Sequence, residues 1–528
     1  MRGVGLVDLY SVAQSKVSDE SLCGVIAWAL AGSAEIKTRD LTTLLRGRGE
    51  YQTDKIRAEP DDRISGKTRT GAELTTKRAK AGSRAVIETT HLFVLALLVF
   101  IFGLGSRVFS RTVVTGPLAF VGFGLLLAPG VCEALGIGHL FGDTEVFKGS
   151  IHILGEVTLV VVLFTDAAQI QLRSLLKGAA MPVRLLGIGM PLTILLGAMI
   201  AAPFFGELGI WELALLATML APTDAALGQA VVTSKKVPNR IRQSLSVESG
   251  LNDGIAVPLV LVFASLASIG QGAQATEMTG IECARFAATQ VTMGPLAGIV
   301  IGGIGAWLMM LAVRHGWMEH SFQELAGITL AIIAFVGAGL IGGNGFIAAF
   351  VAGIVVGNSS KEVCSCLYDF AEAESQLLML TTFFLVGLTL AWEPLREASW
   401  QVWVYGVLSL TVIRMVPVAL SMIGLGLRPA TLGFLGWFGP RGLASILFSV
   451  LLIHDLPVPH SDLIVQVVIV TVLMSVFAHG VSAAPLSVMY GRSIGEGKKP
   501  ATYELGRERA EIVRKRSLAH SETKESQD

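Results

Sequence analysis

Four ionisable side chains lie deep inside long apolar segments of the sequence: Asp224, Glu248, Asp253 and Arg414. Asp166 lies nearer the end of another such segment and is a weaker fifth. A charge at the centre of a lipid bilayer costs at least about 2.5 to 3.5 kcal/mol, so these groups indicate an ion pathway or a buried ion pair. Asp224 and Asp253, carboxylates on consecutive segments, are the leading candidates for binding a cation or a proton.

Helix geometry separates these residues into two sets. Positions four apart share one face of a helix, whereas positions five apart differ by about 140°. Ser249 and Asp253 therefore point the same way, while Glu248 and Asn252 point another way. Arg414 is the basic residue at mid-segment that could approach Glu248, and an unpaired buried charge is strongly destabilising. We predict a structural ion pair between Glu248 and Arg414.

Asp224 follows Pro222, and the segment that contains both is expected to be a broken helix. Proline removes a backbone hydrogen-bond donor and disfavours helix at the preceding residue. A break at membrane depth leaves carbonyl groups free, which is tolerated where they line a cavity, and such breaks form cation sites. The stretch Gly436–Gly442 predicts a second break in a later segment.

The composition is that of a membrane protein, because 52% of the 528 residues are hydrophobic and 16% are charged. From about residue 91, apolar segments follow one another, each long enough to cross a hydrocarbon layer of roughly 30 Å as a helix. We predict an all-α polytopic fold with about thirteen transmembrane helices. Their approximate spans are 91–107, 112–129, 150–169, 182–203, 211–232, 243–268, 288–313, 321–341, 344–358, 371–391, 400–426, 430–453 and 462–488.

Basic residues indicate the orientation and the domain boundaries. Lys and Arg concentrate in alternate connections between the spans, and such residues stay on the cytoplasmic side. We therefore expect a transmembrane domain at 91–490 in the plasma (inner) membrane and a short cytoplasmic tail at 491–528. Residues 1–90 are also basic but would lie outside, and their apolar run at 22–34 is too short to span. We interpret them as disordered, as sequence upstream of the true start, or as a poorly packed extension.

Other features exclude several classes of function. The formal net charge is zero, which gives no reason to expect nucleic acid as a partner. The five cysteines are scattered and have no His or Cys partner at metal-ligand spacing, so no structural metal is expected. No cofactor is expected either. His479, near the end of the last span, is interpreted as a hydrogen-bonded packing residue rather than a proton relay.

Four motifs together resemble a known family. They are Pro-Thr-Asp (222–224), Glu-Ser-Gly-Leu-Asn-Asp-Gly (248–254), Gly-Pro-Arg-Gly (439–442) and Ala-His-Gly (478–480). Their order and spacing resemble the signatures of monovalent cation:proton antiporters of the NhaP and sodium/proton-exchanger type. The resemblance covers about residues 91–490. It implies thirteen helices in two inverted six-helix repeats, a core domain with crossed broken helices 5 and 12, and a domain that forms a homodimer.

The resemblance also implies roles for single residues. Asp253 would be the principal ligand of the cation and the proton, and Asp224 would complete a site for the transported monovalent cation. The Thr223 backbone carbonyl and Ser249 would lie around them. Asn252, beside Asp253, joins these candidate cation-binding residues.

Three further positions follow from the same resemblance. Asp166 matches an acidic position that assists the site through water, and Arg441 would lie at the cytoplasmic side of helix 12. Glu248 and Arg414 match an ion pair of the core domain. Asn252 stands where electrogenic relatives carry a second Asp, which favours electroneutral exchange.

The expected function is secondary active antiport, in which Asp253 binds either a proton or Na⁺ or K⁺ and the site moves by alternating access. Competition for one carboxylate makes the exchange obligatory. One alternative is a cation channel, which would pass cations without coupling to protons. A remote one is an intramembrane aspartyl protease, since Tyr368-Asp369 fits half of that signature, although a Gly-x-Gly-Asp partner is absent.

Overall fold

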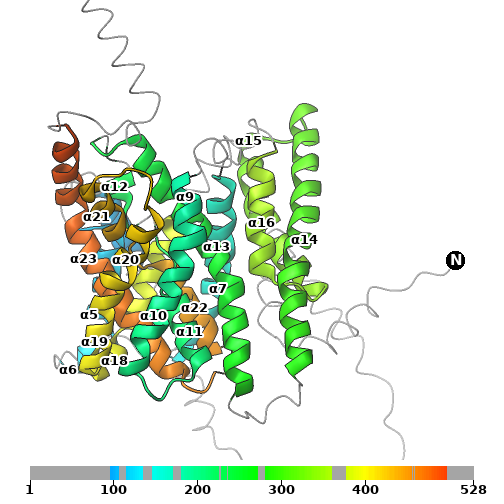
Figure 1. Cartoon of the computed structure of the whole chain (residues 1–528). Coiled ribbons are helices and arrows are strands. Elements are labelled where there is room, and N and C mark those ends of the chain that lie inside the picture. Colours follow the sequence, from blue (N-terminus) through cyan, green and yellow to red (C-terminus); the bar gives the residue numbers. More distant parts are fainter. Residues whose placement is uncertain are drawn as a thin grey trace, which may run out of the picture. The chain divides into compact units, whose positions relative to one another are not determined.

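The protein is described by a computed structural model over residues 95–105, 114–134, 145–170, 180–224, 227–232, 234, 236–270, 280–359, 376–454, 456 and 458–495, all within one structural unit. These ranges contain helices and connections but no strand, as Figure 1 illustrates. The prediction of an all-helical chain is confirmed for them. The expectations for residues 1–90 and for the tail beyond residue 495 lie outside the described residues, as do Tyr368 and Asp369.

The helices are listed here in chain order. They are α5 (Gly116–Leu126), α6 (Pro129–Ala134), α7 (Glu145–Ala168), α9 (Ala180–Arg184), a π-helical turn (Leu185–Gly189), α10 (Met190–Phe204), α11 (Ile210–Met219), α12 (Gln229–Val232), α13 (Asn239–Gly270), α14 (Gly280–Arg314), α15 (His320–Leu340), α16 (Gly345–Gly357), α18 (Trp392–Glu397), α19 (Trp400–Leu410), α20 (Val412–Ser421), α21 (Pro429–Trp437), α22 (Leu443–His454) and α23 (Ser461–Gly495). Leu95–Gly105 and Gln376–Thr389 are helical as well.

Several of these helices suit a membrane. Within the described residues, five helical stretches, some of which run through consecutive helices of this list, are long and apolar enough to cross one: Ala180–Phe204, Asn239–Ser268, Ala288–Arg314, Trp400–Ser421 and Ser461–Ser493. Predicted spans at 150–169, 243–268, 288–313 and 462–488 coincide with α7, α13, α14 and α23. The total of thirteen spans and the inverted repeats remain predictions.

One predicted span proves to be two helices. The span at 400–426 divides at Thr411, whose ψ of −91° separates α19 from α20. The Thr411 hydroxyl donates a hydrogen bond of 2.6 Å to Val407 O, and such bonds from a Thr side chain to the preceding turn disturb helices. Arg414 thus lies in the first turn of α20, a separate helix.

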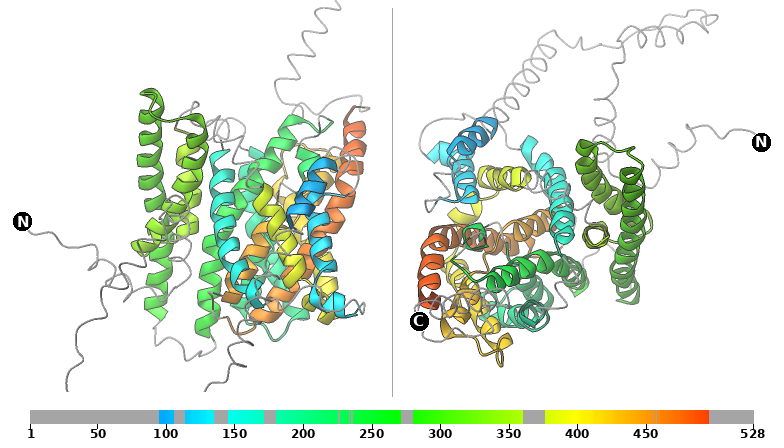
Figure 2. Two further views of the ribbon diagram at one scale, coloured as in Figure 1. Left: turned by 180° about the vertical axis from the view of Figure 1, so that it is seen from behind. Right: turned by 90° about the horizontal axis from the view of Figure 1, so that it is seen from above.

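Small residues bring neighbouring helices close together. Gly353 and Gly357 of α16 lie against the backbone of α7 at Phe164 and Ala168, where an added Cβ atom would overlap carbonyl groups. Gly302 of α14 lies in the same way against α16. Close approach through small residues is typical of helix packing in membranes. Figures 1 and 2 show α14, α15 and α16 as neighbours, with α7 beside α16.

Two helical segments are interrupted. Helix α11 ends at Met219, and the backbone of residues 221–224 is irregular rather than helical. Helix α21 ends at Trp437, and α22 begins only at Leu443. The Pro in each interruption lacks a backbone donor, as the sequence led us to expect. These interruptions, together with α7, α13, α20 and α23, position the residues described next.

Candidate functional site

The two interruptions are joined directly through Asp224. Its backbone N–H donates a hydrogen bond of 2.8 Å to Pro440 O. Its Oδ2 accepts a hydrogen bond of 3.0 Å from the backbone N–H of Leu443, the first residue of α22. A carboxylate at a helix N-terminus satisfies a free donor and interacts favourably with the helix dipole. Asp224, in the first interruption, is therefore hydrogen-bonded through both its backbone and its side chain to the second interruption and the start of α22.

Gly442 is the reason that Asp224 can approach so closely. A Cβ atom added at Gly442 would overlap the Asp224 carboxylate. Any larger residue at position 442 would require the Asp224 side chain to move. The Gly-Pro-Arg-Gly motif thus supplies both the acceptor at Pro440 and the space at Gly442.

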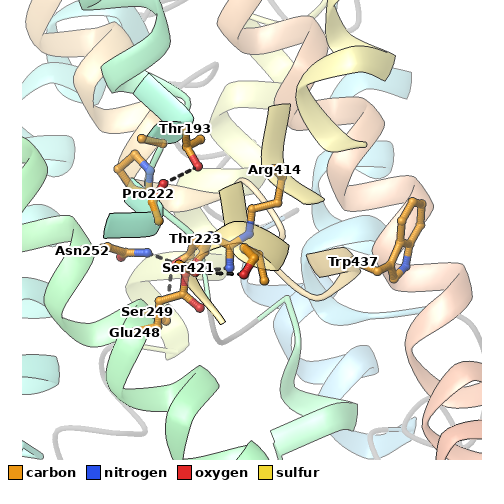
Figure 3. A network of polar contacts seen from close by, with 12 residues as sticks. Thr193, Pro222, Thr223, Glu248, Ser249, Asn252, Arg414, Ser421 and Trp437 are labelled. Atoms are coloured by element: carbon orange, nitrogen blue, oxygen red, sulfur yellow. Dashed lines mark hydrogen bonds and ion pairs between the residues drawn. The ribbon is translucent and has the colours of Figure 1, made fainter. Parts of the chain in front are cut away.

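Helix α13 holds the first interruption through two polar side chains. Ser249 Oγ donates to Thr223 O at 2.7 Å, and Asn252 Nδ2 donates to Thr223 Oγ1 at 2.7 Å. Figure 3 shows both side chains directed at Thr223. All three residues are buried. The backbone carbonyl and the hydroxyl of Thr223 are therefore fixed in place from one helix.

Asp253 lies one turn further along α13. It is 9% exposed, and its Oδ1 has no hydrogen-bond partner within the described part of the chain. Asn252 Oδ1 is also buried and has no hydrogen-bond partner within the same described residues. Asp166 and Asp224 are near enough to interact electrostatically with Asp253. A buried carboxylate oxygen without donors, among other carboxylates, is suited to bind a proton or a cation.

Asp166 reaches this group from α7. The backbone of α13 passes it at Gly250, where an added Cβ would lie 3.9 Å from the Asp166 Cβ. Asp166 is half-buried. The structure thus brings Asp166, Asp224 and Asp253 together from α7, the first interruption and α13.

A cavity lies beside the two interruptions. It is small, with room for about one water molecule, and its lining includes Thr223, Asp224 and Ser249. Its remaining lining comes from Gly228, Val231, Val232, Leu245, Phe438 and Pro440. Backbone that is irregular at membrane depth is expected to line a cavity, and residues of both interruptions border this one.

Glu248 and Arg414 form an ion pair away from these groups. Arg414 Nη2 lies 2.6 Å from Glu248 Oε1, and both side chains are 3% exposed. Gly439 packs against the Arg414 guanidinium and has no space for a Cβ atom. The pair therefore fastens α13 to α20 beside the second interruption, as Figure 3 shows for Glu248 and Arg414.

Arg441 lies between the interruptions. Its position at the cytoplasmic side of helix 12, which the resemblance implies, stays a prediction; the residue is 0% exposed. Its Nη1 donates to Ala221 O and, at 3.1 Å, to Pro222 O. These are carbonyls that the break in the first segment releases. Arg441, in the second interruption, thus provides hydrogen-bond donors for backbone carbonyls of the first interruption.

Three contacts were missed by the sequence analysis. Ser445 Oγ donates to Met219 O at 2.7 Å and so adds a further bond between the segments. Glu212, 1% exposed, accepts hydrogen bonds from Gly209 N at 2.7 Å and from His460 N at 3.1 Å. His479 is joined to Trp437 O across the second interruption. The sequence around Ser445 and around Glu212 contains no pattern that indicates these partners.

Residues 93–489 match the family model described as "Sodium/hydrogen exchanger, transmembrane". The chain belongs to the sodium/hydrogen exchanger family. The resemblance drawn from the four motifs is confirmed. This family is one of transmembrane exchangers and not of proteases.

Named relatives of this exchanger are similar over most of its length. The K⁺/H⁺ antiporter NhaP of Alkalimonas amylolytica is 23% identical over 75% of this chain and 66% of its own length. The K⁺/H⁺ antiporter NhaP2 of Shewanella oneidensis is 23% identical over 73% and 64%. The Na⁺/H⁺ antiporter NhaP of Pseudomonas aeruginosa is 26% identical over 62% and 78%. The chain thus spans slightly less than two thirds of the length of the first two relatives.

A solved structure shares the fold of this exchanger. The sodium proton antiporter MjNhaP1 of Methanocaldococcus jannaschii superposes with a TM-score of 0.62 at 16% identity. The match covers 77% of this chain and 99% of that chain. At this identity the likeness establishes the fold, and the function is argued from the site.

Proposed function

We propose that this protein is a secondary active antiporter that exchanges a monovalent cation, Na⁺ or K⁺, for a proton by alternating access. The observation that carries the proposal is the buried Asp253 Oδ1, which has no hydrogen-bond partner in the described structure and lies among carboxylates beside an interrupted helix. Family membership supports a transporter rather than an enzyme. A channel would need no such protonatable group at the site.

The roles we propose follow the geometry. Asp253 binds the cation or the proton in turn, and it requires one of them because a buried unpaired charge is costly. Thr223 O, held by Ser249, keeps one lone pair for a cation. Asp224 adds negative charge while bound to the start of α22. Asn252 fixes Thr223, and Asp166 acts on Asp253 through space or through water.

The remaining parts of the proposal rest on the resemblance and on the two interruptions. A neutral Asn252 beside Asp253 supports exchange of one cation for one proton. The interruptions fall in predicted spans 5 and 12, which occupy the same place in two six-span halves joined by one linking span. We accordingly propose thirteen helices with inverted repeats, a homodimer in the plasma membrane, and a cytoplasmic C-terminus.

The test uses the purified full chain in proteoliposomes with a trapped pH-sensitive dye. Na⁺, K⁺ and Li⁺ are added in turn, because relatives are named for both K⁺ and Na⁺. A cation should dissipate an imposed pH gradient only if it is a substrate. If the exchange is electroneutral, clamping the membrane potential with valinomycin should leave the rate unchanged. Asp253→Asn should abolish the response, whereas Asp462→Asn, at an exposed site on α23, should retain it. Persistent exchange by Asp253→Asn, or cation flux without proton movement, would refute the proposal.

A further inference from the structure

A polar bridge crosses the interruption between α21 and α22, and none of the roles above uses it. In a continuous helix the Arg441 N–H would donate to Trp437 O, four residues earlier. Here the Arg441 N–H donates instead to Ser475 Oγ on α23 at 2.7 Å. Ser475 Oγ lies 3.1 Å from His479 Nδ1, and His479 Nε2 lies 2.9 Å from Trp437 O. Two side chains of α23 therefore stand in the place of one missing helical hydrogen bond.

The hydrogen-bond directions place a hydrogen on one nitrogen of the imidazole, Nε2. Trp437 O can only accept, so His479 Nε2 must carry a hydrogen. Ser475 Oγ accepts from Arg441 N–H and can donate its own hydrogen to Nδ1. His479 Nδ1 also lies 2.9 Å from the backbone carbonyl oxygen of Ser475, so both atoms of Ser475 that face the ring contact this nitrogen. Ser475 and His479 lie four residues apart on one face of α23, and they are 0% and 1% exposed.

The bridge acts on the site through residues 438–442. This stretch carries Pro440 O, which accepts from Asp224 N–H, and ends at Leu443 N–H, which donates to the Asp224 carboxylate. At the start of the stretch, Phe438 N–H donates to Phe434 O and Gly439 N–H donates to Trp437 O, whereas the Arg441 N–H donates to Ser475 on α23. The bridge fixes the spacing of the two groups that bind Asp224 because it ties Trp437, just before the stretch, and Arg441, within it, to a single helix, α23.

We infer that His479 is a positioning residue of the cation site: with Ser475 it replaces the missing hydrogen bond between Arg441 N–H and Trp437 O and so holds the groups that bind Asp224. This inference rests on the proposed function for its transport readout. It requires that loss of the bridge weaken cation binding while the chemistry at Asp253 remains intact.

The experiment compares four variants. His479→Phe keeps an aromatic ring but removes the hydrogen bonds, and His479→Gln can keep a donor and an acceptor on a side chain of similar reach. Ser475→Ala removes the middle of the bridge with a smaller change of volume. Ser487→Ala is the matched control, because this buried serine of α23 donates only to Ala483 O of its own helix.

Two measurements are made on each variant, with Na⁺ and with K⁺. The first is the apparent KM for the cation and the maximal rate per folded protein in proteoliposomes. We expect KM to rise about tenfold for His479→Phe and Ser475→Ala, the effect of about 1.4 kcal/mol, with the maximal rate within about twofold. His479→Gln should stay near the parent protein, and Ser487→Ala should match it.

The second measurement is hydrogen–deuterium exchange of the amides in residues 437–443, which needs no transport. Exchange at Arg441 should accelerate in His479→Phe and Ser475→Ala but not in Ser487→Ala. An unchanged KM with a lower maximal rate, equal damage by Gln and Phe, or unchanged amide exchange would each overturn the inference. If His479→Phe does not fold, Ser475→Ala decides. If the parent protein shows no cation-driven proton movement, the proposed function fails while amide exchange still decides the bridge.

Discussion

Breaking the ion pair between Glu248 and Arg414 should strongly destabilise the folded protein. Both side chains are 3% exposed and the charged atoms lie 2.6 Å apart, so neither charge can turn to water when its partner is removed. Loss of one member of such a buried pair costs about 3 to 5 kcal/mol, because it leaves the other charge uncompensated. We expect this loss for Glu248→Gln and for Arg414→Met. The double variant should lose far less than the sum of the two, since no isolated charge remains.

The free energy of unfolding can be followed in mixed detergent micelles by intrinsic fluorescence as the denaturing detergent increases. Glu393→Gln and Arg396→Met are matched controls, because both residues are exposed on α18, and each should change stability by no more than about 0.5 kcal/mol. The apparent KM for the cation should stay constant in the active fraction of each variant. Additive losses in the double variant, or single variants as stable as the controls, would refute a structural pair.

Three further outcomes follow from other contacts of the described residues. Gly442→Ala should reduce exchange severely, because its Cβ would overlap the Asp224 carboxylate, whereas Gly433→Ala, with open space at its Cβ, should retain activity. Asn252→Ala removes the bond to Thr223 Oγ1 and should raise the apparent KM for the cation about threefold to tenfold, measured by dye quenching against cation concentration. Glu212→Ala leaves the backbone N–H groups of Gly209 and His460 without their acceptor and should lower the free energy of unfolding by about 1 to 3 kcal/mol. Thermal unfolding measures this change, and an unchanged midpoint would contradict the role.

The sequence predicts the interruptions well because their cause is local. Pro222 and the Gly-Pro pair at 439 and 440 lack the donors or the rigidity that a helix needs, and both interruptions lie where those residues stand. The Glu248 and Arg414 pair could be derived as well, since few buried charges were available and each needed a partner. The spacing of Ser249 and Asp253 likewise follows from one helix.

Other contacts could not be read from the sequence because they depend on how distant segments cross. Nothing near Arg441 indicates that its guanidinium reaches carbonyls about 220 residues earlier. The division at Thr411 arises from a single backbone torsion angle within a continuous apolar run. The sequence favours a hydrogen-bonded packing role for His479, and only the position of α23 beside Trp437 shows that Ser475 and Trp437 are its partners. A contact between two distant helices leaves no periodic pattern in the sequence of either one.

The bonds between the two interruptions have an evolutionary consequence. Several hydrogen bonds join residues 219–224 to residues 440–445. They run from Asp224 N to Pro440 O, from Leu443 N to Asp224 Oδ2, from Arg441 to two carbonyl oxygens, and from Ser445 Oγ to Met219 O. Two loops fastened at so many points cannot separate without exposing unsatisfied backbone to an apolar medium. They should therefore travel as one body through the transport cycle, and substitutions in one loop should be tolerated only with compensating changes in the other. Among homologues, the strongest covariation in the chain is then expected between these two short stretches.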